Sequence, residues 1–475
     1  MAAVVYRFRR DLRLDDHAGL AAAGRRGEIL PLLVLDSETE ARLSRSPKRW
    51  AFYCSAVAAL DGALRQRGSQ LIVRRGPASA VIREIARQSD ATGVVWSSSY
   101  DPAGVERDEE LQSELEESGL WAHIVHDSPA IPPEETACAR PSQGEGYRAF
   151  VPYFDVWRKL HAASYEVPLL LPFASSDVVG EGLPRVAEAF KEDGAADPDV
   201  AWRVLTEFLR GPGLAYSAAV NVPADDRTSH LSAHLSFGTL SARVVVRETL
   251  ARIDDPFLLT EERTSLRLFL RSLAMRDFFL QLAWYHAGRP DEVLQPKMRG
   301  FPFAESHPEL DAWRAGCTGY PLIDAGIRQL HATGWMHPRV RAIAASFLCF
   351  DLGVDWRIGR DEWEKYLIED DPALSNGNWQ WIAGVGADLA AYPRIYNPRK
   401  QARQFDAAGV YARRWIPELA HLPSGAFGRP KEHTAQIDLP LFSGSVSYPA
   451  PVVDHERAAR AFLERYRAHE REIAR

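Results

Sequence analysis

The segment around which the chain is organised reads Ile368-Glu-Asp-Asp-Pro-Ala-Leu-Ser-Asn-Gly-Asn-Trp-Gln-Trp-Ile382. It combines three acidic residues, a Ser-Asn-Gly turn and two tryptophans separated by one residue, which is an unusual set for a plain core segment. Two positions along a helix correspond to a rotation of about 200°, so Trp379 and Trp381 must face different neighbours. We therefore expect one indole in the core and the other at a cavity.

The residues upstream, from Thr318 to Leu348, have the apolar rhythm of a helix that is interrupted at Gly334. Arg339 and Arg341 are expected to open the next helix. The motifs TGYPLIDAGIRQLHATGWMHPRVR, DWR, SNGNWQW and YPRIYNP occur in this order from Thr318 onward. They resemble the signature of the DNA photolyase/cryptochrome family of blue-light flavoproteins, in its bacterial, class I photolyase-like form, and the similarity runs over most of the chain.

The bulk composition fits a soluble protein of two domains, with 475 residues of which 46% are hydrophobic and 25% charged. A net charge of −7 argues against a generally basic nucleic-acid binder, so any contact with DNA needs a local patch of arginines. The four cysteines have no C-x-x-C spacing, and no metal site is expected. Without an apolar run of about 18 residues or a signal peptide, we expect a cytoplasmic protein. We also expect it to be a monomer.

The apolar pattern changes along the chain. Over residues 1–128, predicted strands near 2–8, 29–36, 70–73, 93–96 and 123–125 alternate with helical stretches such as 49–67 and 78–87. This alternation predicts a Rossmann-like parallel α/β sheet that is buried on both faces. Residues 129–198 are rich in Pro, Gly, Ser and acidic side chains and are expected to form a connector. Residues 199–475 are expected to form an all-α domain, with helices at 201–210, 243–253, 261–285, 323–331, 339–352, 361–367 and 455–475.

The loop FRRDLRLDDHAGL follows the first predicted strand, where an open parallel sheet places its ligands. We interpret most of its charges as solvated ion pairs, each contributing about 1 kcal/mol at most. The loop also resembles the opening of the family's antenna domain, which often binds a second chromophore, a folate or a deazaflavin. Folate-binding members carry an Asn-Glu pair where this chain has Ala103 and Gly104, so a folate is not expected.

The segment Thr228-Ser-His-Leu-Ser232 offers hydroxyls and backbone N–H groups at a helix start, which suits the pyrophosphate of a dinucleotide. Taken alone, an ordinary helix cap is the simpler interpretation. The preceding tyrosine and the following LSFGTLS match the order in which the family holds FAD. The resemblance therefore implies FAD, bound by Tyr216, Thr228, Ser229, His230, Leu231 and Ser232.

Two further groups are assigned to the flavin by resemblance. Arg276 matches an arginine beside the flavin phosphates, although an ion pair with Asp277 explains it equally well. Arg341 would stabilise the negative charge of a reduced flavin, while carboxylates of the run Glu369, Asp370 and Asp371 hold the guanidinium in place. The competing interpretation of this acidic run is a solvated helix end, and the family has Asp at the position of Glu369. A metal site is disfavoured because nothing supplies further ligands.

The resemblance also concerns electron transfer. Trp379 and Trp356 match two of the family's three electron-transfer tryptophans, although buried tryptophans are usually plain core residues. The third position is Phe303, which is much harder to oxidise, so Trp313 or Tyr320 are the candidate substitutes. Ser375 stands where photolyases have Asn and cryptochromes often have Asp or Cys facing flavin N5, so the preferred redox state cannot be carried over.

The lesion pocket of the family's cyclobutane-dimer photolyases uses a Glu, a Trp, an Asn and the second Trp of WQW. The corresponding positions here are Ser272, Met275, Pro338 and Trp381, of which only the last is retained. The pattern of 6-4 photolyases, with a second His at Pro338, is not met either. Two functions stay open: a deoxyribodipyrimidine photo-lyase that passes an electron from reduced FAD to a flipped pyrimidine dimer in DNA, or a cryptochrome-like photoreceptor without repair. A nucleotide-binding protein without photochemistry is the third alternative.

Overall fold

The computed structural model describes residues 2–138, 146–160, 172–174, 178–186, 195–285, 291–387, 393–420, 422 and 448–473. The chain forms two compact units that are interleaved along the sequence. The first unit comprises Met1–Tyr216, Ser229–Pro290 and Ile368–Leu374, and the second comprises Ser217–Thr228, Asp291–Leu367 and Ser375–Arg475. The boundary expected near residue 198 stays a prediction, and 139–145, 161–171, 175–177 and 187–194 of the expected connector lie outside the described residues.

The first unit contains a five-stranded sheet in the order β3-β2-β1-β4-β5, and each neighbouring pair is parallel. The strands are β1 (Ala3–Phe8), β2 (Glu28–Leu35), β3 (Ile72–Arg75), β4 (Ala91–Ser97) and β5 (Trp121–Val125). Between β1 and β2 the register pairs Val4 with Ile29 and Phe8 with Leu33. The expected fold class, a parallel α/β sheet followed by a helical region, is confirmed.

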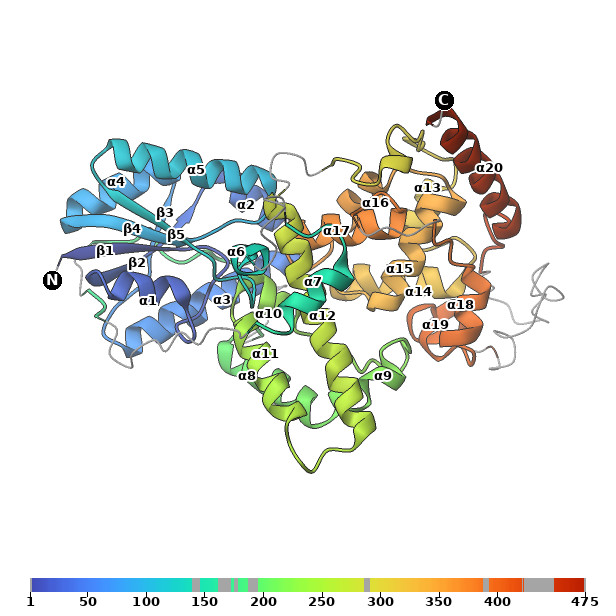
Figure 1. The fold of residues 1–475 in the computed structure, drawn as a ribbon, viewed down its shortest axis with the longest axis horizontal. Coiled ribbons are helices and arrows are strands. Elements are labelled where there is room, and N and C mark those ends of the chain that lie inside the picture. The colour runs from blue at the N-terminus through green and yellow to red at the C-terminus, as the bar shows by residue number, and fades with distance from the viewer. Residues whose placement is uncertain are drawn as a thin grey trace. The chain divides into compact units, whose positions relative to one another are not determined.

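Both faces of this sheet are covered by helices, as a continuous apolar strand pattern requires. Figure 1 shows α1 (Ala18–Gly24) and α3 (Pro47–Gln66) on one face, with α4 (Ala78–Ser89) and α5 (Pro102–Glu117) on the other. Side chains alternate along β1, so Val4, Tyr6 and Phe8 join the core under α1 and α3. Val5 joins the other core, and Arg7, two residues further along β1, lies on the same face of the strand.

The remaining helices account for most of the rest of the chain. Before residue 290 they are α2 (Ser37–Ser44), α6 (Pro133–Cys138), α7 (Phe150–Trp157), α8 (Pro198–Arg210), α9 (Tyr216–Ala219), α10 (Ser232–Phe237), α11 (Ala242–Ile253) and α12 (Thr260–Tyr285). After it they are α13 (Leu310–Ala315), α14 (Pro321–Thr333), α15 (Pro338–Ser346), α16 (Trp356–Trp363), α17 (Pro372–Ala383), α18 (Pro398–Phe405), α19 (Val410–Trp415) and α20 (His455–Ile473). None of these described helices has the length and apolar character that a membrane crossing requires.

Two helix expectations are wrong in detail. The helix expected at 361–367 is α16, which begins at Trp356 because the Asp355 side chain caps it by accepting from the backbone N–H of Arg357. The helix expected at 339–352 ends as an α-helix at Ser346 and continues as a π-helical turn, η4 (Phe347–Asp351). The break at Gly334 is confirmed, since this glycine ends α14 in the left-handed conformation.

Part of the loop that follows β1 is buried, which corrects the expectation of solvated ion pairs for Asp11 and Arg13. Asp11 and Arg13 are 1% and 4% exposed, and the backbone N–H of Leu12 donates to the carbonyl of Phe237. Arg13 donates to the Asp127 carboxylate at 2.7 Å, and Arg243 of α11 donates to the other oxygen of that carboxylate at 2.8 Å. Burial alone would raise the pKa of Asp127, but the two guanidinium groups hold it far below its usual value.

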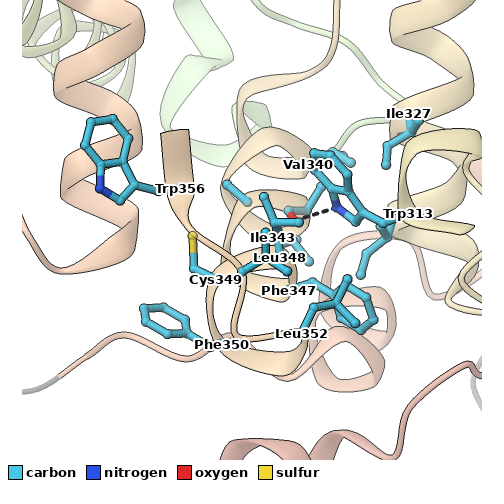
Figure 2. Close-up of a cluster of buried hydrophobic side chains, with 14 of the residues drawn as sticks. Trp313, Ile327, Val340, Ile343, Phe347, Leu348, Cys349, Phe350, Leu352 and Trp356 are labelled. Atoms are coloured by element: carbon cyan, nitrogen blue, oxygen red, sulfur yellow. Dashed lines mark hydrogen bonds between the residues drawn. The ribbon is translucent and has the colours of Figure 1, made fainter. Parts of the chain in front are cut away.

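The core of the second unit is built around α14, α15 and η4. Phe347, Leu348 and Cys349 project from η4 into it. Figure 2 shows two large indoles of this core, those of Trp313 and Trp356, well separated in the view, with residues of α15 and η4 between them. The Trp313 indole N–H donates to the backbone carbonyl of Ala344 at 3.0 Å, so this buried polar group is satisfied.

Asp127→Asn should lower the free energy of unfolding of the first unit by about 3–5 kcal/mol, because two buried guanidinium groups lose their counter-charge. Denaturant unfolding followed by circular dichroism measures the effect. The folded pKa lies below the unfolded value of about 3.9, so this stabilisation is present above that pH and decreases as the pH falls below it.

Asp311→Asn is the matched control, because its carboxylate is 90% exposed and pairs with Arg314 at the surface. We expect a change of about 0–1 kcal/mol there. Equal, small effects at both positions would contradict the role given to the buried carboxylate.

Candidate functional site

A cavity of about 460 Å³ lies in the first unit, at the carboxyl ends of β1, β2 and β4. Parallel sheets bind their ligands at this edge, where the connections on either side of a strand lead in opposite directions. Its lining includes Arg7, Arg10 and Arg42 together with Ser97 and Tyr100. The cavity is therefore polar, rich in guanidinium groups and placed where the fold offers a ligand site.

Arg7 is the most unusual member of this lining. The alternation of β1 brings its side chain to the edge of the cavity, and the residue is only 7% exposed. Its buried Nε has no hydrogen-bond partner among the described residues. Burial and the neighbouring Arg9 lower the pKa of Arg7 to about 10, so the group is still a cation at neutral pH. A buried cation with an unmet donor favours an anionic ligand in this cavity.

Asp370, predicted as a cofactor residue, lies in the same lining and is surrounded by arginines. Its carboxylate accepts from Arg10 at 2.9 Å and from Arg42 at 2.6 Å, and Arg49 is 3.9 Å away. Burial acts to raise the pKa of Asp370, but the three guanidinium groups lower it overall. The contacts of its side chain are thus with arginines of the α/β part, and its role toward a cofactor stays a prediction.

Asp371 and Arg276 lie in the first unit as well. Asp371 accepts from the backbone N–H of Leu374 at 3.2 Å at the start of α17, and burial raises its pKa although Arg276 opposes the shift. The Arg276 guanidinium donates to the carbonyl and the hydroxyl of Ser128, at 2.8 and 2.9 Å. These contacts favour a structural role for Arg276, and a position beside a phosphate stays a prediction.

Most of the other residues assigned to the flavin in the first unit are exposed or half-buried. Tyr216 is half-buried between the rings of Phe208 and Phe269, at centroid distances of 5.9 and 5.7 Å. His230 is exposed and has a φ of 52°, a strained conformation that is typical of functional segments. The remaining members are Ser229 and Glu369, which are half-buried, Leu231, which is buried at the start of α10, and Ser232, which is exposed.

The second unit carries Thr228, Arg341 and Ser375. The Thr228 hydroxyl donates to the Asp226 carboxylate at 3.0 Å, and Asp226 itself has a φ of 41°. Arg341 is half-buried on α15 and donates through Nε to the carbonyl of Met336 at 2.7 Å. Ser375 is half-buried on α17. These positions leave hydroxyl and guanidinium groups close to the surface of the unit.

The two tryptophans of the WQW motif face different environments, as expected. Trp379 is 4% exposed in the core of the second unit. Trp381 is half-buried, and the guanidinium of Arg394 lies 5.3 Å from its ring centre. A planar ring beside a cation at a partly open position is suited to stacking on an exposed base.

The electron-transfer residues expected from the sequence, Trp356 and Trp379, are accompanied by a further buried tryptophan in the second unit. Trp356 is fully buried, and the guanidinium groups of Arg357 and Arg360 lie 4.8 and 5.2 Å from its ring centre. Sequence reasoning missed Trp363, whose ring centre is 4.6 Å from that of Trp379. Its spacing of seven residues from Trp356, two helical turns, was a signal that could have singled it out.

The positions that correspond to the lesion pocket offer little to hold a dimer. Ser272 and Met275 lie three residues apart on α12 and therefore on one face of it. The Ser272 hydroxyl donates to the carbonyl of Phe269 at 2.6 Å, within its own helix. Pro338 is exposed as the first residue of α15, and His337 before it is buried and accepts from the backbone N–H of Arg339.

Asp11, His17 and Asp127 form a buried cluster whose possible ligand atoms lie within 4.8 Å of one another. Asp11 accepts from the hydroxyls of Tyr6 and Ser97, and Asp127 accepts from two arginines. Cationic guanidinium groups next to a carboxylate oppose a metal ion at the same place. The cluster therefore fits a hydrogen-bonded network better than a metal centre.

Comparisons with known proteins place these features in one family. Residues 4–172 match the family model described as DNA photolyase, and residues 269–468 match the model described as FAD binding domain of DNA photolyase. A deoxyribodipyrimidine photo-lyase of Streptomyces griseus is 36% identical over 98% of this chain and 99% of its own length. A solved cryptochrome of Synechocystis has a TM-score of 0.84 at 27% identity, covering 98% of this chain and 99% of its own. An archaeal photolyase of Sulfolobus tokodaii, solved with two FAD molecules, has a TM-score of 0.77 at 26% identity, covering 98% and 100%.

Proposed function

Because the chain belongs to the DNA photolyase/cryptochrome family, we propose that it is an FAD-dependent photolyase driven by blue light, with a diverged lesion pocket. The observation that carries the proposal is the similarity to a photo-lyase over 98% of the chain. The substrate is a pyrimidine dimer in DNA, to which an electron passes from the reduced cofactor. All four cysteines are free, which supports the proposed cytoplasmic location.

The proposed FAD set follows the family resemblance. A pyrophosphate requires hydroxyls, backbone N–H groups and cations. Ser229 and Ser232 of the first unit and Thr228 of the second offer hydroxyls, and Arg276 would contribute a cation in addition to its contacts with Ser128. When bound, FAD supplies light absorption and the transferred electron. Arg341 holds a positive charge for the reduced ring system, and Asp371 holds a carboxylate whose pKa burial raises. Tyr216, His230, Leu231, Glu369 and Asp370 complete the proposed set.

DNA contact is proposed to be local, because the chain carries a net charge of −7. Trp381, with Arg394 against its ring, provides a stacking face and a cation at one place in the second unit. Arg339 is a further cation of that unit, although its guanidinium already donates to the Asn221 side chain at 2.6 and 2.9 Å. Binding through a few arginines implies an affinity that decreases as salt increases.

A second candidate function is a photoreceptor of the cryptochrome type that does not repair DNA. The observation that favours it is the loss of three lesion contacts at Ser272, Met275 and Pro338. The likeness to a cryptochrome structure over 98% of the chain supports it as well. A repair assay separates the two functions directly, since only the photolyase converts dimers to bases under light.

We also propose that the cavity of the first unit binds a second, anionic chromophore of the flavin or deazaflavin type. The unmet donor and charge of Arg7 favour a phosphate or carboxylate there. A folate is disfavoured, because a Cβ on Gly104 would approach the Cβ of Ser99 to 2.6 Å, which leaves no room for the Glu of folate-binding members. The Sulfolobus relative, which contains two FAD molecules, provides a precedent.

The unmodified protein should repair cyclobutane dimers weakly, and the triple variant Ser272→Glu, Met275→Trp, Pro338→Asn should raise repair at least about tenfold. One restored hydrogen bond to a charged group contributes about 1.5–3 kcal/mol, and stacking contributes about 1–3 kcal/mol per base. A tenfold change in affinity for the dimer corresponds to about 1.4 kcal/mol. The measurement is blue-light repair of an oligonucleotide with one thymine dimer, read by chromatography. Ser113→Glu, on the exposed face of α5, is the control and should change nothing. Rapid repair by the unmodified protein would contradict the diverged pocket.

Titration of the FAD-loaded protein with FMN should show a second flavin site, which Arg7→Gln weakens at least about tenfold. The reason is the loss of a hydrogen bond from a buried cation, about 1.5–3 kcal/mol. Arg75→Gln is the matched control, since Arg75 lies on β3 with a half-exposed side chain and pairs with the half-exposed carboxylates of Glu40 and Glu181. Equal FMN affinity in the wild type and Arg7→Gln, or preferential binding of a folate, would contradict the proposal.

A further inference from the structure

We propose that the electron which reduces FAD under light reaches it through a stack of three tryptophans, Trp379, Trp363 and Trp313, instead of a route through Trp356. This inference rests on the proposed function in one respect: FAD is the electron acceptor, and Trp379 is the first tryptophan that it oxidises. The contacts of the three indoles all lie within the second unit.

The three indoles form a continuous aromatic path. The ring centres of Trp379 and Trp363 are 4.6 Å apart with an angle of 55° between the planes. Those of Trp363 and Trp313 are 6.0 Å apart, and their planes are within 15° of parallel. Both distances lie in the range of interacting aromatic pairs, and each indole comes from a different helix, α17, α16 and α13. An electron therefore crosses only van der Waals gaps along this stack.

The surroundings of Trp356 oppose its oxidation. An indole that loses an electron becomes a cation, and two guanidinium groups already lie against the Trp356 ring, at 4.8 and 5.2 Å. The attraction between a cation and a neutral ring turns into repulsion when the ring itself is positive. Asp355 and Asp291 pair with these arginines and weaken the repulsion, but the two guanidinium groups still lie against the ring.

The position expected to continue the route from Trp356 is also blocked. Phe303 packs against Phe301 at a centroid distance of 4.8 Å and against Phe462 at 6.4 Å. Phe462 in turn contacts Phe350 at 4.8 Å. A benzene ring is far harder to oxidise than an indole, so this phenylalanine cluster cannot carry the positive charge outward. An electron vacancy on Trp356 has no favourable next site among these rings.

The stack, in contrast, provides a favourable end point at Trp313. Its indole N–H donates to the Ala344 carbonyl, whose partial negative charge stabilises a positive indole (Figure 2). A carbonyl oxygen does not accept the proton outright, and Trp313 is 1% exposed, so the oxidised indole keeps its proton. The near-parallel ring of Trp363 shares the charge. The oxidised form should therefore persist as a protonated cation radical.

No bond changes within the three indoles, and the electron and proton balance closes at the external thiol. Trp379 passes one electron to the light-excited FAD, Trp363 refills Trp379, and Trp313 refills Trp363. The vacancy on Trp313 is filled by one electron from an external thiolate, which forms when the thiol releases its proton to water. The resulting thiyl radical couples with a second one to a disulfide. The net result is one electron from the thiol to FAD, with the three indoles unchanged.

The test compares flavin photoreduction by blue light and a thiol in the FAD-loaded wild type, Trp363→Phe and Trp356→Phe. We expect the rate to fall at least about tenfold more in Trp363→Phe than in Trp356→Phe, and flash spectroscopy should show that Trp363→Phe loses the long-lived tryptophan cation radical. Trp415→Phe, at a half-buried tryptophan of α19, is the matched control and should leave rate and radical unchanged. A normal rate in Trp363→Phe with a strong loss in Trp356→Phe would overturn the inference.

Near-ultraviolet circular dichroism of the flavin-free protein gives an independent readout. Stacked indoles couple, so the signal of the Trp363–Trp313 pair should disappear in Trp363→Phe and in Trp313→Phe, and not in Trp415→Phe. If Trp363→Phe does not fold, Trp313→Phe interrupts the same stack one step further and decides the question. A wild type that binds no FAD overturns the proposed function and this inference together, whereas a flavin-loaded Trp363→Phe with normal photoreduction overturns the inference alone.

Discussion

The first unit depends on a buried carboxylate, that of Asp127, held between the guanidinium groups of Arg13 and Arg243. The three residues come from the loop after β1, the segment after β5 and α11, so one charge arrangement joins the edge of the sheet to a helix far along the chain. Each member is 4% exposed or less. An unpaired charge at such depth costs several kcal/mol. We therefore expect the three segments to be held in place together, and to be released together if one partner is lost.

This constraint has a functional consequence within the same unit. A fixed loop after β1 keeps Arg9 and Arg10 on their carboxylate partners, Asp108 and Asp370, at the rim of the cavity. Arg7, at the end of β1, then stays buried with an unmet donor. In the second unit the corresponding constraint is aromatic packing, which holds Trp363 between two other indoles. The first unit thus provides a charged ligand site, and the second unit provides the proposed path for electrons.

The sequence was sufficient to predict a structural feature where a residue pattern is compatible with only one arrangement. Alternation of apolar runs with helical stretches predicted the parallel sheet, and the two-residue spacing of Trp379 and Trp381 predicted their different surroundings. It was insufficient where burial depends on distant partners: the charges after β1 were expected in solvent, because nothing local indicates that Asp127 and Arg243 lie beside Arg13. Trp363 was missed as part of a stack because its seven-residue spacing from Trp356 indicates only a shared helix face, whereas the indoles that contact it come from two other helices.

The absorption spectrum of the purified protein, recorded in the dark and during blue illumination with a thiol reductant, most directly tests the central claim that this chain is a light-active flavoprotein. We predict a structured flavin band that corresponds to at least one FAD per chain. The band should bleach in the light and return when air re-oxidises the cofactor. A protein without a flavin band, or with a band that light does not change, would contradict the account.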